Sequence, residues 1–168
     1  MAEFFATHRL RILRYLIGLY GCSEPDADDV VQETIVLIRQ HWKKIRTYQK
    51  PEAYWYKIAS RLYQRWQGER ARERACPDPE EYLRAVADLT DGAENVNLGM
   101  VAMAILRELP LKQRQVFWLR EAAGFSTEET AKIMSISDGT VKSQLHDAKA
   151  GLKKLLREYG AAMESDTR

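Results

Sequence analysis

The chain is poor in cysteine and histidine. Its 168 residues include two Cys and three His. Cys22 and Cys76 match no metal-ligand spacing, and two thiols cannot frame a disulfide scaffold, so we expect a reduced pair. We also expect no metal ion and no other cofactor. Hydrophobic residues make up 45% of the chain, which is enough for a core that needs no disulfide bond and no structural metal ion.

Long apolar runs are also absent. No stretch approaches the roughly 20 apolar residues that a membrane-spanning helix needs. The start, Met1-Ala-Glu-Phe, lacks the basic residues and the apolar core of a signal peptide. These absences predict a cytoplasmic protein without direct membrane insertion.

A third absence is the alternating pattern of β-strands. Apolar residues recur at helical spacing through most of the chain, with Pro and Gly mostly at boundaries, which predicts an all-α fold. The helical pattern lapses around Cys76-Pro-Asp-Pro and Asp91-Gly92. We therefore predict two small helical domains, residues 1–74 and 98–168, joined by a flexible acidic linker over residues 75–97.

The formal net charge of +2 conceals a strong segregation of charge. Arg39 to Arg74 holds 11 Lys and Arg against 3 Asp and Glu, a net charge of +8. Asp78 to Glu94 holds 1 against 6, a net charge of −5. A basic block that is also aromatic, followed by an acidic block, indicates two nucleic-acid-facing parts joined by a different segment.

The C-terminal half contains the pattern of a helix-turn-helix. Ser126 and Glu129 have the spacing of a capping box, and Ser137 can cap a second helix that runs to Tyr159. A helical wheel places one packed face on the second helix, made of Val141, Leu145, Ala148, Leu152, Leu155, Leu156 and Tyr159. Lys142, Lys149 and Lys153 then suit phosphates, while Ser143 and His146 could reach base edges. The alternative for these residues is a solvated polar face.

Two helices are predicted in the N-terminal part. The first covers Phe4 to Tyr20 and ends at Gly21, and the second begins at Pro25 and runs through Trp42. Carboxylates lie on the exposed face of the second helix. Three interpretations remain open for them: favourable placement at the helix dipole, a Mg²⁺ site built from Asp26, Asp29 and Glu33, or an acidic docking face.

A third helix is predicted from Glu52 to Arg74. It interleaves aromatic residues with basic ones: Tyr54, Trp55, Tyr56, Tyr63 and Trp66 with Lys57, Arg61, Arg65, Arg70, Arg72 and Arg74. Aromatic rings can stack on unpaired bases, at about 1–3 kcal/mol each. Ile58 and Leu62, with Tyr54 or Trp55, belong to a buried stripe. Only some rings therefore remain for nucleic acid, and the pattern does not say which.

Taken together, these motifs resemble a bacterial sigma factor of the extracytoplasmic-function (ECF) group. The resemblance rests on the acidic stretch DADDVVQET from Asp26 to Thr34, the aromatic stretch YWYKIA from Tyr54 to Ala59, and GTVKS from Gly139 to Ser143. It implies a non-catalytic subunit that brings core RNA polymerase to specific promoters. It also implies an anti-sigma partner.

The resemblance assigns residues to three surfaces. Core polymerase would bind Asp28, Asp29, Gln32 and Glu33. The single-stranded −10 element would contact Lys43, Lys44, Arg46, Tyr54, Trp55, Lys57, Arg61 and Arg65, with Ile45 to Glu52 as the specificity loop for one captured base. The −35 duplex would contact Thr140, Lys142, Ser143, His146 and Lys149.

Three residues depart from the pattern that the resemblance implies. Family members commonly carry Asn and Asp where this chain has Arg61 and Arg65, and a basic residue where it has Asp147. Two other functions stay open: a stand-alone helix-turn-helix transcriptional regulator, or a helical adaptor or anti-sigma protein that binds only other proteins.

Overall fold

The computed structural model describes residues 1–70 and 103–165, so the predicted linker at 75–97 lies outside the described residues. The chain divides into two compact units, Met1–Val96 and Asn97–Arg168. In the described part the regular elements are all helices, which confirms the predicted all-α class.

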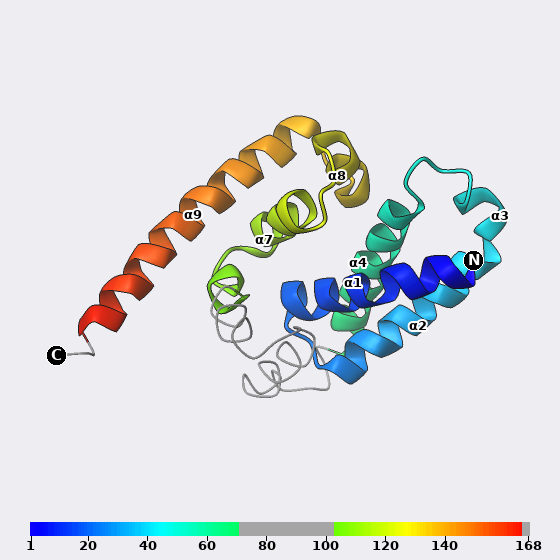
Figure 1. Ribbon diagram of the computed structural model, residues 1–168, viewed down its shortest axis with the longest axis horizontal. Helices are drawn as coiled ribbons and strands as arrows, with labels where there is room; N and C mark the ends of the chain where they lie inside the picture. Colours follow the sequence, from blue (N-terminus) through cyan, green and yellow to red (C-terminus); the bar gives the residue numbers. More distant parts are fainter. Residues whose placement is uncertain (71–102, 166–168) are drawn as a thin grey trace. The chain divides into compact units, whose positions relative to one another are not determined.

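The first unit is built on three long helices. They are α1 (Ala2–Tyr20), α2 (Glu24–Gln40) and α4 (Pro51–Arg70), which pack pairwise (Figure 1). A short helix, α3 (Trp42–Ile45), lies between α2 and α4 in the chain. The side chains buried between the long helices include Ile12, Tyr15, Leu16, Val30, Ile38, Trp55 and Leu62.

Local chemistry sets the ends of α1 and α2. Gly21 ends α1 in the left-handed conformation, with φ of 67°, and its N–H donates to the carbonyl of Ile17. Ser23 then caps α2, because its hydroxyl accepts from the N–H of Asp26. The cap starts α2 one residue before the predicted Pro25. The prediction that this helix continues to Trp42 is wrong, since α2 ends at Gln40 and His41 leaves the helical conformation.

The second unit contains the predicted helix-turn-helix. Residues 103–107 are helical, and α7 (Leu111–Phe117) continues into one π-helical segment, η1 (Trp118–Ala122). They are followed by α8 (Thr127–Met134) and α9 (Asp138–Ser165). The last helix, α9, packs on α7 and α8. Its approach is close at Gly151, where an added Cβ would lie 2.7 Å from a methyl carbon of Leu109.

The predicted packed face of α9 is correct at one end of the helix and wrong at the other. Val141 and Ala148 are fully buried, whereas Leu156 is 58% exposed and Tyr159 is 42% exposed. The physical reason is length. At 28 residues α9 is far longer than α7 and α8, with 7 and 8 residues, so these two helices cannot cover its second half.

Candidate nucleic-acid interface and acidic face

The acidic face of α2 is joined to its two neighbouring helices by ion pairs. Asp28 pairs with Arg9 of α1 and accepts a 3.0 Å hydrogen bond from the Gln32 amide. Glu33 pairs with Arg65 of α4, with 3.3 Å between Oε1 and Nη2. Asp29 is exposed. The structure thus brings the four predicted residues onto one helix, where Asp28 and Glu33 already have basic partners.

The described residues also bear on the metal interpretation of this face. Among them, no group of three or more His, Cys, Asp or Glu side chains is placed to hold a metal ion. The carboxylate of Glu33 is instead directed at the guanidinium of Arg65.

Trp55 is part of the core, which corrects its assignment to the −10 strand. It is 0% exposed, and its indole Nε1 donates a 2.7 Å hydrogen bond to Oγ1 of Thr34. Its ring contacts Phe4 and Phe5 of α1, with centroids 5.6 and 5.3 Å away. A ring enclosed in this way cannot stack on a base. The spacing of Trp55, Ala59 and Leu62, four and then three residues, was the signal for a buried stripe.

Two tyrosines near the start of α4 remain accessible. Tyr54 is half-buried, and Tyr48 of the preceding loop is 37% exposed. Their rings meet edge to face, with centroids 5.7 Å apart at 71°. The sequence singled out the loop but not Tyr48 itself. By contrast Tyr56 and Tyr63 are buried, and burial raises the pKa of Tyr56 to about 12.

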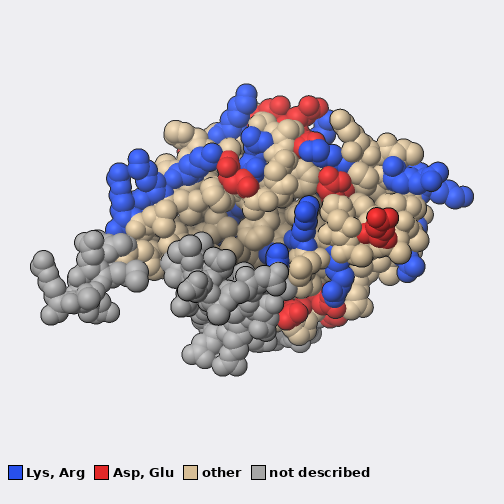
Figure 2. Space-filling model, in the orientation of Figure 1, with Lys and Arg blue, Asp and Glu red and all other residues tan. Residues whose placement is uncertain are grey.

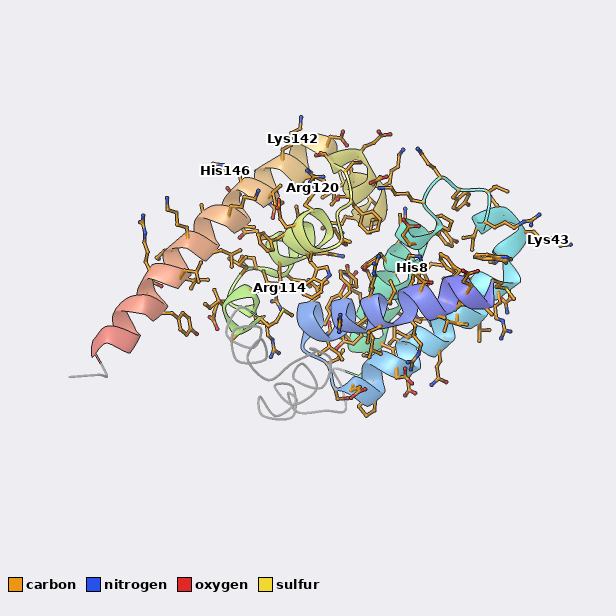
Figure 3. All side chains as sticks on the ribbon, in the orientation of Figure 1. His8, Lys43, Arg114, Arg120, Lys142 and His146 are labelled. Atoms are coloured by element: carbon orange, nitrogen blue, oxygen red, sulfur yellow. The ribbon has the colours of Figure 1, made fainter. Side chains whose placement is uncertain are left out.

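Basic side chains surround this tyrosine pair in the sequence and form a row along α4. Lys43, Lys44 and Arg46 are exposed on and just after α3, and Figure 3 shows Lys43 pointing outward. The row on α4 has members four residues apart, which places them on one side of the helix: Lys57, Arg61 and Arg65. Burial lowers the pKa of Lys57, and the nearby charge of Arg61 lowers it further.

Hydrogen bonds confirm both predicted caps of the helix-turn-helix. The N–H of Glu129 donates to Oγ of Ser126 at 3.1 Å, and the N–H of Ser126 donates to the Glu129 carboxylate at 2.7 Å. Ser137 accepts from the N–H of Thr140 at 3.1 Å. Between the two helices, Ser135 adopts a left-handed conformation with φ of 59°. The turn between α8 and α9 is fixed at both ends, because the N–H of Ser135 donates to the carbonyl of Ala131 and Ser137 caps α9.

The exposed side of α9 carries the predicted −35 residues. Lys142, Ser143 and His146 are exposed, and Figure 3 shows Lys142 and His146 on the side of α9 that faces away from α7. Thr140 is exposed, although its hydroxyl bonds Ser137 at 2.8 Å. Lys149 is exposed too, and it pairs with Glu121 of η1 at 2.9 Å. In Figure 2, Lys and Arg follow α9 along the edge of the molecule.

Arg120 is a residue of this unit that sequence reasoning missed. Its guanidinium donates to the carbonyl of Phe125, across the turn at Gly124 where φ is 72°. The bond joins η1 to the start of α8 and so fixes where the helix-turn-helix begins. The π-helical segment that carries Arg120 leaves no periodic signal in the sequence.

Comparison with known proteins decides the family. Residues 4–73 match the model of sigma-70 region 2, and residues 100–152 match sigma-70 region 4. The RNA polymerase sigma-E factor of Streptomyces avermitilis is 35% identical over 131 residues, covering 78% of this chain and 71% of that protein. The chain belongs to the ECF group of RNA polymerase sigma factors. A sigma-E factor of Streptomyces antibioticus is also 35% identical, over 156 residues that cover 92% of this chain and 83% of that one.

Two solved structures share the fold of this chain. The sigma factor RpoE of Bartonella quintana, solved with the anti-sigma factor NepR, aligns with a TM-score of 0.65 at 23% identity. That alignment covers 94% of this sigma factor and 98% of RpoE. CnrH, solved with the cytosolic domain of CnrY, aligns with a TM-score of 0.63 at 22% identity, covering 94% and 87% of the two chains.

The family settles which of the three candidate functions is correct. The protein is an alternative sigma factor, which binds core RNA polymerase and directs it to specific promoters for transcription initiation. This confirms the sigma-factor interpretation over a stand-alone regulator or an adaptor. Among the described helices, none is long and apolar enough to cross a membrane.

Proposed function

We propose that the two units of this sigma factor divide the work of promoter recognition among three surfaces. The acidic face of α2, formed by Asp28, Asp29, Gln32 and Glu33, binds core polymerase. The two units that we propose are residues 1–74 and residues 98–168, with residues 75–97 as the linker between them. The single observation that carries the proposal is the placement of exposed charged residues on separate helices: acidic on α2, and basic on α4 and α9.

The surface for the single-stranded −10 element lies on α3, the following loop and α4. It consists of Lys43, Lys44, Arg46, Tyr54, Lys57, Arg61 and Arg65, to which we add Tyr48. Basic side chains follow the phosphate backbone, and an accessible ring offers a face on which an unpaired base can stack. The edge-to-face contact of Tyr48 with Tyr54 supports this role, because it fixes the orientation of one ring relative to the other.

The surface for the −35 duplex lies on α9. It consists of Thr140, Lys142, Ser143, His146 and Lys149. A capped helix that follows a short helix and a tight turn is the geometry that places a recognition helix in a major groove. The exposure of Lys142, Ser143 and His146 on one side of α9 supports this assignment.

We also propose an anti-sigma protein as the regulator of this chain. RpoE and CnrH, which share its fold, were solved with an anti-sigma factor and with CnrY respectively. We further propose that the chain has no catalytic activity or cofactor of its own and that it acts in the cytoplasm, where core polymerase and promoter DNA meet.

Reconstituted transcription tests the division of work. The purified chain with core polymerase on a promoter library should give initiated transcripts. Replacing Asp29 and Glu33 together by Lys should abolish the transcripts, because the acidic face would then repel a basic partner. Glu3→Lys, on α1, is the matched control and should leave them unchanged. Transcripts that survive the double replacement would remove the α2 face from the polymerase contact.

A further inference from the structure

The ion pair between Glu33 and Arg65 joins two surfaces that have different partners. Glu33 lies on the acidic face of α2, and Arg65 lies in the basic row of α4. Their side chains are 39% and 62% exposed, with 3.3 Å between the charged atoms. Each side chain is therefore open to solvent, yet each neutralises the other in the isolated chain.

We propose that the Glu33–Arg65 ion pair is an autoinhibitory contact that links polymerase binding to −10 strand binding. When core polymerase supplies a cation or hydrogen-bond donor to Glu33, Arg65 is released to a DNA phosphate. When the chain is free, the pair weakens both surfaces. This inference rests on the proposed roles of α2 and α4.

The charge distribution on α4 supports a shared pair. Lys57, Arg61 and Arg65 lie four residues apart, so like charges follow one another along one side of the helix. Burial is the main cause of the lowered pKa of Lys57, and the charge of Arg61 adds to it, so neighbouring cations in this row repel one another. Glu33 offsets the charge of Arg65, the last of the three basic residues in this row. Losing Glu33 to polymerase leaves the row more positive and so more attractive to phosphate.

The second ion pair of the acidic face provides a comparison within the same molecule. Arg9 pairs with Asp28 and so holds another carboxylate of the α2 face. Arg9 belongs to α1 and not to the proposed −10 surface. Breaking the Arg9–Asp28 pair should therefore free a carboxylate for polymerase without altering the binding of single-stranded DNA.

The size of the effect follows from the exposure of the pair. Exposed ion pairs contribute about 0.2–1 kcal/mol, which corresponds to a change in affinity of up to about fivefold. Coupling between two binding sites is reciprocal, so the factor gained for DNA when polymerase binds equals the factor gained for polymerase when DNA binds. Salt should reduce the factor because the charges are exposed.

A double-mutant cycle on the full chain tests this inference. The affinity of the chain for core polymerase is measured at low salt for the wild type, Arg65→Gln, Glu33→Gln and the double variant. We expect Arg65→Gln to tighten core binding about two- to fivefold, by freeing Glu33. In the Glu33→Gln background, Arg65→Gln should change nothing. Arg61→Gln, which removes the same charge one turn away, is the matched control and should have the smaller effect.

The affinity of the free chain for a fluorescent single-stranded −10 oligonucleotide gives the reciprocal readout. Glu33→Gln should raise it about two- to fivefold, and more than Asp29→Asn or Arg9→Gln does. Either of two results would overturn the ion-pair inference alone. One is an equal effect of Arg65→Gln and Arg61→Gln on core binding. The other is a tightening of core binding by Arg65→Gln that persists in the Glu33→Gln background. A wild-type chain that fails to bind core polymerase through α2 would instead refute the proposed function.

Discussion

The indole N–H of Trp55 donates to the hydroxyl of Thr34 inside the first unit, at 2.7 Å, and so joins α4 to α2. The Thr34 hydroxyl in turn donates a hydrogen bond to the carbonyl of Val31, also at 2.7 Å. Both residues are 0% exposed. Each polar group in this chain of bonds therefore depends on the other, because no water can replace a lost partner.

We expect Thr34→Val to destabilise the first unit by about 1–3 kcal/mol, the cost of leaving the buried Trp55 N–H without an acceptor. Urea unfolding followed by tryptophan fluorescence measures the change. Thr34→Ser keeps the hydroxyl and should cost less. If Thr34→Val and Thr34→Ser prove equally stable, the bond contributes nothing.

The capping box at the start of α8 should have a measurable effect on stability. Ser126→Ala removes the acceptor for the Glu129 N–H, and an N-cap replacement of this kind costs about 1 kcal/mol. Thermal unfolding monitored by circular dichroism should show the loss. Ser143→Ala, at an exposed position of α9, is the control. An unfolding midpoint for Ser126→Ala equal to that of the control would contradict the prediction.

Lys142→Ala should weaken binding to the −35 duplex and make its salt dependence less steep. Each phosphate contact contributes about one unit to the slope of log affinity against log salt, so one unit should be lost. Holoenzyme binding at several salt concentrations gives the slope. Lys154→Ala removes a charge that lies elsewhere on α9 and should leave the slope unchanged. A slope that is the same for Lys142→Ala and the wild type would exclude a phosphate contact.

Asp147 is exposed on α9, beside His146. Its carboxylate repels nearby phosphates, so we expect Asp147→Asn to tighten binding to the −35 duplex severalfold, about the effect of one exposed charge pair. Competition binding with a panel of duplexes shows whether promoter preference also changes. Glu158→Gln, farther along α9, is the control. Weaker binding by Asp147→Asn would mean that the carboxylate contacts a base or another donor.

The stability of the first unit should fall with pH near neutrality because of His8. Burial lowers the pKa of His8 below its usual 6.5, and Arg11 lowers it further, whereas Glu52 raises it. Protons therefore bind the unfolded state first as pH falls, so stability is full above about 6.5 and decreases as pH falls toward the pKa of the folded state.

His8→Gln should remove this part of the pH dependence. The free energy of unfolding, measured from pH 7.5 to 5.5, should fall more steeply for the wild type than for the variant. Carboxylates titrate lower and are common to both proteins, so the difference isolates His8. Identical pH profiles would show that its pKa is the same in the two states.

Residue patterns along the chain account for those features of the protein that depend on near neighbours in the sequence. The capping box links residues three apart, and the Gly21 cap links residues four apart, so residue types at fixed spacing were enough to locate both. The helix-turn-helix, the all-α class and the family resemblance follow from such local patterns. Helix length belongs here only in part. Apolar periodicity located the ends of α1 and α2 to within two residues, whereas α9 runs six residues past the predicted end at Tyr159.

Tertiary structure alone decided which side chains remain available. Trp55 and Tyr54 are adjacent and equally suited to stacking on a base, yet Trp55 faces Thr34 and the core while Tyr54 meets Tyr48. Arg9 and Asp28 are 19 residues apart, and Arg65 and Glu33 are 32 apart. No spacing rule connects such pairs, because the packing of α1, α2 and α4 sets their distance. That packing determines which charges of this sigma factor are already paired before polymerase binds.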